Sequence, residues 1–189
     1  MATQKVNVRT IVLVLMIIAA TAFRLLSYEF KFLSNFTPVG AIAIFGGVYF
    51  NDKWKAYVTV LLALVASDIL INSLYNQPLI SEYTLWNCVC FALIVLAGTL
   101  IKKVNLATAL IIIIAPVLIH WLILDLPWIH ELSIYPKTFA GYMASLTAAI
   151  TFERNMLLGD IVFGGILFGG FELAKNRYTM LRTNRELAV

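Results

Sequence analysis

The chain has 189 residues, of which 61% are hydrophobic and only 13% are charged. Soluble globular domains are nearer half apolar and a quarter charged, so this composition excludes a water-soluble enzyme. The formal net charge is +4, but the basic residues lie between apolar blocks and form no stripe interleaved with aromatic residues, which argues against a nucleic-acid partner. We expect an all-α polytopic membrane protein.

Apolar blocks of about twenty residues recur along the chain, the length that a helix needs to cross roughly 30 Å of hydrocarbon. We predict one transmembrane domain, residues 1–174, with six transmembrane helices and one outer half-helix, followed by a basic cytoplasmic tail, residues 175–189. The half-helix covers residues 139–150, which are too few for a span. The six spans cover residues 9–26, 37–50, 56–74, 83–101, 106–124 and 156–173.

The first two apolar blocks have features that bear on whether each is a transmembrane helix. Block 9–26 contains Ala20-Thr21-Ala22, which is similar to a signal-peptidase site. No polar segment precedes that site, and cleavage would disturb the charge pattern described next, so we keep the block as a span. Block 37–50 is short, with Pro38 suited to a first helical turn. Its small residues predict a tightly packed helix.

The distribution of positive charge sets the predicted topology. With six spans, the cations that flank them all lie on one side of the membrane, which by the positive-inside rule is the cytoplasm, as are both termini. Seven spans, in which 139–150 also crosses, is the alternative, and it would move the tail cations to the other side. The cations are Lys5, Arg9, Lys53, Lys55, Lys102, Lys103, Lys175, Arg177, Arg182 and Arg185.

Three charged residues lie inside the predicted spans: Arg24, Asp68 and Asp160. Burying a charge there costs at least about 2.5 kcal/mol unless a partner or water offsets it. At a rise of 1.5 Å per residue all three fall in the outer half of the membrane, so we expect an intramembrane ion pair between Arg24 and one of the two aspartates. The pair either fixes helix packing or binds a ligand or a coupling ion, and the sequence leaves both open.

Polar and aromatic side chains near the outer face suit a small solute, because pockets in helical bundles combine apolar walls with a few convergent polar groups. We expect the pocket among the third to sixth spans. Trp and Tyr also gather at membrane interfaces without any ligand, whereas His120 lies in an apolar setting that favours a buried, hydrogen-bonded role. The candidate substrate-binding residues are Asn35, Asp68, Trp86, Asn87, His120, Trp121, Tyr135, Arg154, Asn155 and Asp160.

Motifs for catalysis or metal binding are absent from the sequence. His120, Asp125, His130 and Glu131 match no H-E-x-x-H pattern, and there is no G-x-S-x-G elbow or P-loop. Cys88 and Cys90 lie two positions apart in one apolar run, on different faces of a helix, and predict neither a disulfide nor a metal site. We expect no enzymatic activity, no metal and no cofactor.

Glycines mark faces where helices approach closely. Gly165 and Gly169 form a G-x-x-x-G step in the last span, and Gly40, Gly46 and Gly47 lie in the second. We interpret these as helix-packing residues. A partner that docks on such a face is the alternative.

Several motifs together resemble one family. The chain is similar to DUF6580, a group of small bacterial integral membrane proteins, and more distantly to the substrate-binding S components of energy-coupling factor vitamin transporters. The resemblance covers most of the chain. It rests on Asn35-Phe36-Thr37-Pro38-Val39-Gly40-Ala41, Phe45-Gly46-Gly47, Ser67-Asp68, Tyr135-Pro136-Lys137-Thr138 with Gly141, Arg154-Asn155, Leu158-Gly159-Asp160 and Phe168-Gly169-Gly170.

The resemblance to S components implies a bundle of six helices in the bacterial cytoplasmic membrane. Such a bundle binds a vitamin or similar micronutrient near its outer face, capped by the loop at 27–36. S components dock on a transmembrane coupling subunit, driven by an ATPase pair, through an A-x-x-x-A pattern on helix 1. Ala19, Ala20 and Ala22 do not form that pattern, so a solitary transporter is equally compatible.

The predicted function is therefore binding and uptake of a small organic solute, with the lipid bilayer as surroundings and a coupling subunit as a possible partner. The alternative is a scaffold that assembles other membrane subunits through its glycine-rich helix faces.

Overall fold

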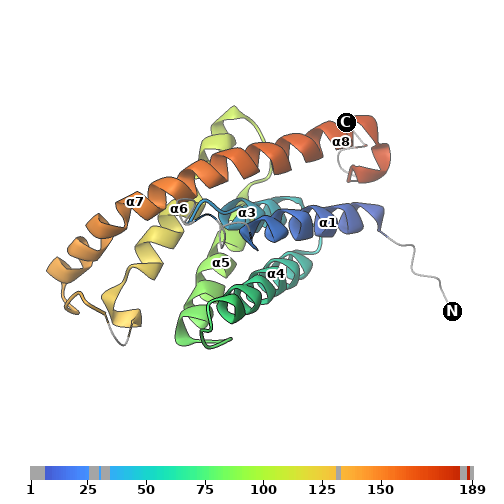
Figure 1. Ribbon diagram of the computed structural model, residues 1–189. Helices are drawn as coiled ribbons and strands as arrows, with labels where there is room; N and C mark the ends of the chain where they lie inside the picture. Colours follow the sequence, from blue (N-terminus) through green and yellow to red (C-terminus); the bar gives the residue numbers. More distant parts are fainter. Residues whose placement is uncertain (1–6, 26–29, 31–34, 131–132, 184–186, 188–189) are drawn as a thin grey trace.

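The computed structural model describes residues 7–25, 30, 35–130, 133–183 and 187. Within these ranges the chain is all-α, with no strand and with six helices when the run Phe139–Arg177 is counted as one (Figure 1). Five of the described helices are long and apolar enough to cross a membrane, as expected of a multi-pass membrane protein. They are Val8–Leu25, Lys53–Leu74, Glu82–Leu100, Leu106–Leu124 and Phe139–Arg177.

The described helices follow the predicted apolar blocks closely. Polar caps set several boundaries: Asn7, Asn105 and Thr138 each accept a hydrogen bond from a backbone N–H in the first turn of the next helix. The elements are α1 (Val8–Ala22), η1 (Phe23–Leu25), α3 (Val39–Tyr49), α4 (Lys53–Leu74), α5 (Glu82–Leu100), α6 (Leu106–Leu124), η3 (Pro127–Ile129), α7 (Phe139–Gly164), η4 (Gly165–Gly169), α8 (Gly170–Arg177) and η5 (Thr179–Leu181).

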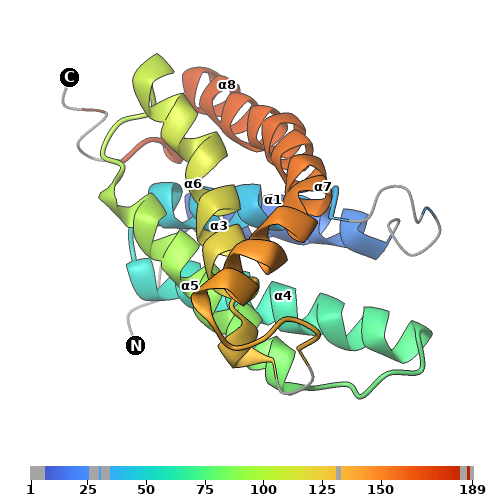
Figure 2. The same cartoon turned by 90° about the vertical axis from the view of Figure 1, so that its left-hand side faces the viewer.

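Helix α3 lies at the centre of the bundle, against α1, α4, α5, α6 and α7 (Figure 2). It is apolar on every side and almost wholly buried, as such a helix must be. Its closest neighbour is α5, because both backbones carry a glycine at their crossing. A Cβ atom on Gly47 would lie 2.9 Å from Gly98 Cα, and one on Gly98 would lie 2.5 Å from Ile44 O. The prediction of a short, tightly packed helix is confirmed.

The predicted half-helix at 139–150 is wrong. Segments 139–150 and 156–173 belong to one continuous helical run, Phe139–Arg177. The polar residues at 151–155 do not interrupt the helix because they include neither Gly nor Pro, and because Glu153 has a partner on α6. One continuous helix cannot supply two antiparallel spans, which removes the seven-span alternative.

The run of 39 residues is about 58 Å long at 1.5 Å per residue, well beyond roughly 30 Å of hydrocarbon. It therefore reaches past the membrane or crosses it at a steep tilt. A π-helical turn, η4, interrupts its hydrogen bonding at Gly165–Gly169.

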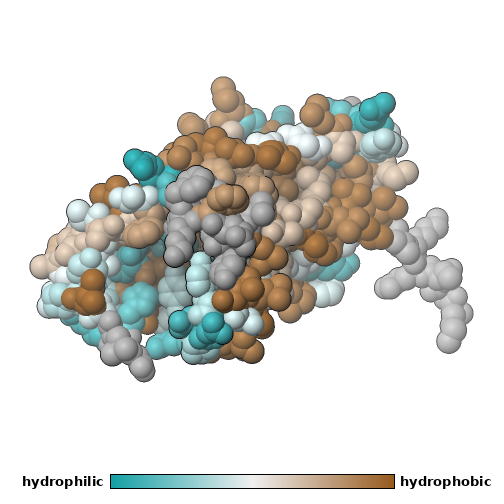
Figure 3. All heavy atoms as spheres, viewed as in Figure 1, coloured by the Kyte–Doolittle hydropathy of each residue, from teal (hydrophilic) through white to brown (hydrophobic). Residues whose placement is uncertain are grey.

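The outer surface of the bundle is apolar. Figure 3 shows hydrophobic side chains over the middle of one face, with hydrophilic ones gathered mainly toward its ends. Soluble proteins rarely expose such continuous apolar surface, whereas lipid-facing helices do. Exposed apolar residues on successive helices include Leu15, Ile18, Leu62, Leu70, Leu85, Leu110 and Ile166.

The start of α1 and the segment after α8 lie at the same end of the molecule (Figure 1). Arg9 Nη2 donates to Tyr49 O at 2.8 Å and its Nη1 donates to Leu181 O. Lys175 is only 8% exposed, so the described part of the predicted tail packs against the bundle. Arg9, Lys53, Lys175 and Arg182 therefore share one end, while Lys5 and Arg185 lie outside the described residues.

Candidate functional site

A cavity of about 250 Å³ lies between η1, α4, α5, α6 and α7, at the start of α3. Its wall combines five apolar side chains with ten polar or charged ones, which makes it more polar than the mostly apolar wall of a typical ligand pocket. We call it the central cavity. It is lined by Arg24, Asn35, Thr37, Val39, Leu64, Asp68, Ile71, Asn72, Ser81, Tyr83, Thr84, Asn87, Phe91, His120 and Met156.

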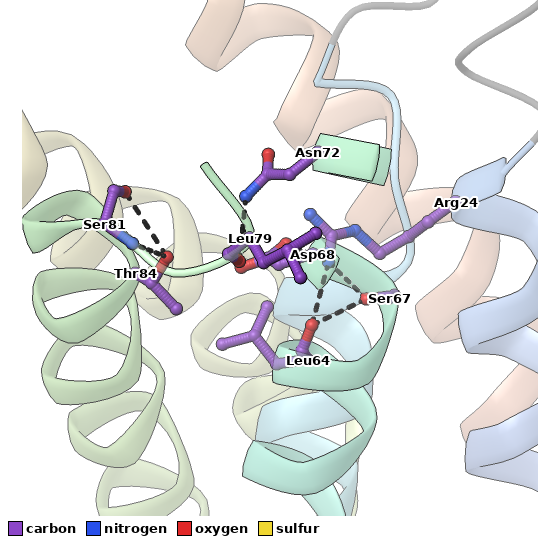
Figure 4. A network of polar contacts seen from close by, with 8 residues as sticks. All are labelled: Arg24, Leu64, Ser67, Asp68, Asn72, Leu79, Ser81 and Thr84. Atoms are coloured by element: carbon purple, nitrogen blue, oxygen red, sulfur yellow. Dashed lines mark hydrogen bonds and ion pairs between the residues drawn. The ribbon is translucent and has the colours of Figure 1, made fainter. Parts of the chain in front are cut away.

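An ion pair joins the end of α1 to α4 in this wall. Arg24 Nη1 lies 2.7 Å from Asp68 Oδ1, with the two side chains 16% and 11% exposed. The same nitrogen donates to Ser67 Oγ, and Ser67 Oγ donates to Leu64 O at 2.8 Å (Figure 4). The structure thus brings the predicted intramembrane cation to Asp68 and not to Asp160.

Hydrogen bonds order the adjoining connection between α4 and α5. Asn72 Nδ2 donates to Leu79 O at 3.3 Å, and the Ser81 N–H donates to Thr84 Oγ1 at 3.2 Å (Figure 4). The second bond belongs to a capping box, which fixes where α5 begins. These contacts hold the polar first turn of α5 beside the ion pair.

His120 on α6 lines the central cavity and is tied to α7. Its Nδ1 lies 2.9 Å from Glu153 Oε1, and the two side chains are 14% and 6% exposed. Donation by Nδ1–H to the carboxylate leaves Nε2 as the ring atom available to other groups. Within the described residues, Glu153 Oε2 is buried without a hydrogen-bond partner.

Asn87 is a polar side chain of α5 in the same wall. It is 8% exposed and borders the cavity. Its amide makes no hydrogen bond to any part of the chain that the structure describes. The amide therefore keeps its donors and its acceptor available to whatever occupies the cavity.

Asp160 lies elsewhere and has a different role. It is 1% exposed on α7, and its Oδ1 accepts from the Ala41 N–H at 2.7 Å. The residue before α3 is Pro38, which has no side-chain cap, so Asp160 supplies the acceptor that the helix N-terminus lacks. Gly40 allows this approach, since its Cβ would meet the carboxylate.

Other predicted site residues lie outside the central cavity. Trp121 Nε1 donates to Leu146 O at 3.0 Å, Arg154 is exposed, and Trp86 and Asn155 are half-buried. Tyr135 lines a neighbouring hollow of about 470 Å³, which adjoins the cavity at Tyr83. The structure therefore brings together Asn35, Asp68, Asn87 and His120, but not Trp86, Trp121, Tyr135, Arg154, Asn155 or Asp160.

The glycines fall into two groups. Gly40, Gly46 and Gly47 lie against other helices, where a Cβ would be crowded. For Gly165 and Gly169 a Cβ would meet nothing within 4 Å, so within the described chain they make no close helix contact.

Metal ligands do not cluster in the described chain: no group of three or more His, Cys, Asp or Glu side chains could hold an ion. Cys88 and Cys90 are free.

Sequence reasoning missed several residues of the site, including Glu153, Thr84, Tyr83 and Phe91. For Glu153 a signal was present. It lies seven positions before Asp160, a spacing that puts both carboxylates on one helix face. Its neighbours Arg154 and Asn155 made the segment look like a polar connection.

Asp125 follows α6, outside the membrane-spanning segments. Burial and, to a smaller extent, the charge of Glu153 raise the pKa of its carboxyl, whereas His120, His130 and a hydrogen bond from Ser145 lower it, and the net pKa is about 6. Because the folded pKa lies above the ordinary value of 3.8, ionisation costs stability. The cost is absent below about pH 4 and grows as the pH rises through 6.

We therefore expect Asp125→Asn to stabilise the protein at pH 8 by about 1–2 kcal/mol, allowing for solvent screening. The gain should vanish toward pH 4. Thermal unfolding of the purified protein at the two pH values measures it. Asp52→Asn, which changes an exposed carboxylate, is the control and should show no such pH-dependent gain. An equal gain at both pH values would contradict the assignment to titration of Asp125.

The chain belongs to DUF6580, a family of unknown function, whose profile matches residues 4–182. No match was found among curated proteins or among solved structures. The predicted resemblance to DUF6580 is thus confirmed, whereas the comparisons show no similarity to S components.

Proposed function

We propose that this member of DUF6580 binds a small polar organic solute in the central cavity and takes part in its uptake across the bacterial cytoplasmic membrane. The observation that carries the proposal is the cavity itself. Polar side chains from five separate segments converge there inside an otherwise apolar bundle. Burying polar groups away from water is costly unless they have partners, so their convergence is best explained by a bound solute or ordered water.

The volume of the cavity limits the solute. At about 30 Å³ per water, 250 Å³ holds roughly eight waters. Pockets for drug-sized ligands start near 300 Å³. The proposed solute is therefore at the small end of the vitamin-like compounds that a resemblance to S components would imply.

The proposed topology has six spans with both termini in the cytoplasm. It is supported by the cations gathered at one end of the bundle, around Arg9, Lys53 and Lys175. The cavity then lies in the outer half of the membrane, because Asp68 is fifteen residues, about 22 Å, from the start of α4 at Lys53. A solute from outside reaches the cavity without crossing the whole membrane.

Two energy sources for uptake are compatible with the proposal. One is docking on a transmembrane coupling subunit driven by an ATPase pair, for which the exposed apolar residues Ile11, Leu15 and Ile18 of α1 provide a surface. The other is a solitary transporter. The loop at 27–36 that would cap the solute falls largely outside the described residues.

A cavity-filling variant tests solute binding. Thermal shifts of the purified protein against a panel of small polar solutes should show a ligand, since one present at 100 times its Kd stabilises the fold by about 2.7 kcal/mol. Ile71→Trp places an indole in the cavity wall and should abolish the shift. Leu70→Trp, next to it but 54% exposed on the outside of α4, is the matched control and should keep it.

A scaffold role is the second candidate, and one observation favours it. The exposed glycines Gly165, Gly169 and Gly170 would each accept a Cβ without contact within 4 Å, so the described bundle does not use this face. A solute panel without any shift, or a shift that Ile71→Trp leaves intact, would overturn binding in the central cavity and put the scaffold ahead.

A further inference from the structure

The charged side chains of the central cavity already have partners within the protein. Arg24 pairs with Asp68 at 2.7 Å, and His120 contacts Glu153 at 2.9 Å. A solute with a net charge would have to compete for these partners or be buried without a counter-ion. Either is expensive in a site this enclosed. The charge pattern therefore favours a neutral solute.

The Asn87 amide indicates which hydrogen-bonding groups a neutral solute should carry. It is 8% exposed, borders the cavity, and has no hydrogen-bond partner in the described chain. Its nitrogen and oxygen are not fully enclosed by the described part of the protein, so they open onto the cavity and pair with whatever fills it. An amide presents a donor and an acceptor side by side in one plane. A neutral group with an acceptor and a donor side by side, such as another amide edge, satisfies both at once.

Two aromatic rings line the cavity together with the Asn87 amide. Phe91 lies one turn further along α5, on the same helix face as Asn87. Its ring centroid is 6.1 Å from that of His120, and both side chains line the cavity. Flat apolar surfaces beside a planar hydrogen-bonding group suit a planar ligand. The Nε2 atom of His120 adds one further hydrogen-bonding position.

We propose that the central cavity recognises a small, neutral, planar solute with a carboxamide or lactam edge, which pairs with the Asn87 amide and lies against Phe91. This inference rests on the proposed solute-binding function and names the class of solute. The volume of about 250 Å³ limits it to about one six-membered ring with a small substituent.

The test uses size-matched probes and the full chain purified in detergent. Benzamide and 2-pyridone carry the amide and lactam edges, while benzoate and benzylamine replace the amide by a negative and a positive charge. We expect the two neutral probes to bind at least tenfold more tightly than the charged ones, as Kd from the concentration dependence of the thermal midpoint. Asn87→Leu keeps the size of the side chain and should raise the Kd for benzamide about tenfold.

The control is Asn51→Leu, the same change at an exposed position between α3 and α4, which should leave benzamide binding unchanged. Tighter binding of benzoate or benzylamine would overturn the neutral class while leaving solute binding intact. Undiminished benzamide binding by Asn87→Leu would overturn the role of Asn87. If no probe binds the wild-type chain, the inference falls, and the wider solute panel with Ile71→Trp then decides separately whether the cavity binds a solute. The wild-type comparison stands even if Asn87→Leu does not fold.

Discussion

Replacing Arg24 by methionine should destabilise the protein by about 3–5 kcal/mol, because it removes one partner of a buried ion pair and leaves the other charge alone. Arg24 Nη1 lies 2.7 Å from Asp68 Oδ1, and both side chains are largely buried. Methionine keeps the length and apolar stem of the side chain, so the loss reports mainly on the guanidinium. The free energy of unfolding in detergent, from thermal or chemical denaturation, measures it.

The double variant Arg24→Met with Asp68→Leu removes both charges and should recover most of the loss, since no uncompensated charge remains. The comparison also separates the two roles that the sequence leaves open. A double variant that folds and still binds solute would make the pair structural. One that folds but no longer binds would make it part of the recognition site.

Lys55→Met is the matched control for the single variant. Lys55 pairs with Asp52 at 2.5 Å, but these side chains are 34% and 52% exposed. Exposed pairs contribute about 0–1 kcal/mol, so this change should have little effect. Equal losses for Arg24→Met and Lys55→Met would contradict the buried character of the Arg24–Asp68 pair.

The helices were predictable because the signal for each is local. An apolar block of sufficient length, bounded by polar residues such as Asn105, identifies a span whatever its neighbours are. That Arg24 pairs with an aspartate was predictable from its position along the span, because opposite charges at the same depth in the membrane lower the cost of burial by pairing. Which aspartate it meets depends on how α1 packs against α4, and that information is not local.

The side chains facing the cavity were only partly predictable, because facing depends on the rotation of each helix. Trp86 and Asn87 are adjacent in sequence, yet successive residues of an α-helix point about 100° apart. Only Asn87 borders the cavity. Asp160 illustrates the same limit. Its charge marked it as a site residue, but its role as the cap of α3 required the approach of α7 to the Ala41 N–H.

The break predicted between 139–150 and 156–173 failed for a related reason. Charged residues predict the end of an apolar span, whereas Glu153 is retained within the helix by His120 on α6. A charge with a partner is compatible with a buried helix. The continuous α7 in turn places Glu153 and Asp160 on one helix face, where one contacts His120 of α6 and the other the start of α3.

The close crossing of α3 and α5 at Gly47 and Gly98 predicts a large loss of stability when a side chain is added there. Gly47→Ala should destabilise the protein by about 1–3 kcal/mol, and Gly47→Val should prevent folding, because the core tolerates little overpacking. A Cβ on Gly47 would overlap Val95 O and lie 2.9 Å from Gly98 Cα. Both contacts are with backbone, so no side chain can move aside. Since α3 is surrounded by the other helices, separating it from α5 disturbs the whole core and the cavity at its N-terminal end.

Gly164→Ala makes the same chemical change where the structure has room, because a Cβ there meets nothing within 4 Å and the backbone is helical. It should be neutral or stabilise the protein by about 0.5–1 kcal/mol, the helix-propensity gain of Ala over Gly. Thermal midpoints and the fraction of monodisperse protein in size-exclusion chromatography measure both variants. Equal behaviour of Gly47→Ala and Gly164→Ala would contradict the close α3–α5 crossing. A loss for Gly165→Ala, a change on the exposed glycine face where a Cβ also meets nothing within 4 Å, would show that a partner covers this face, which is what the scaffold role requires.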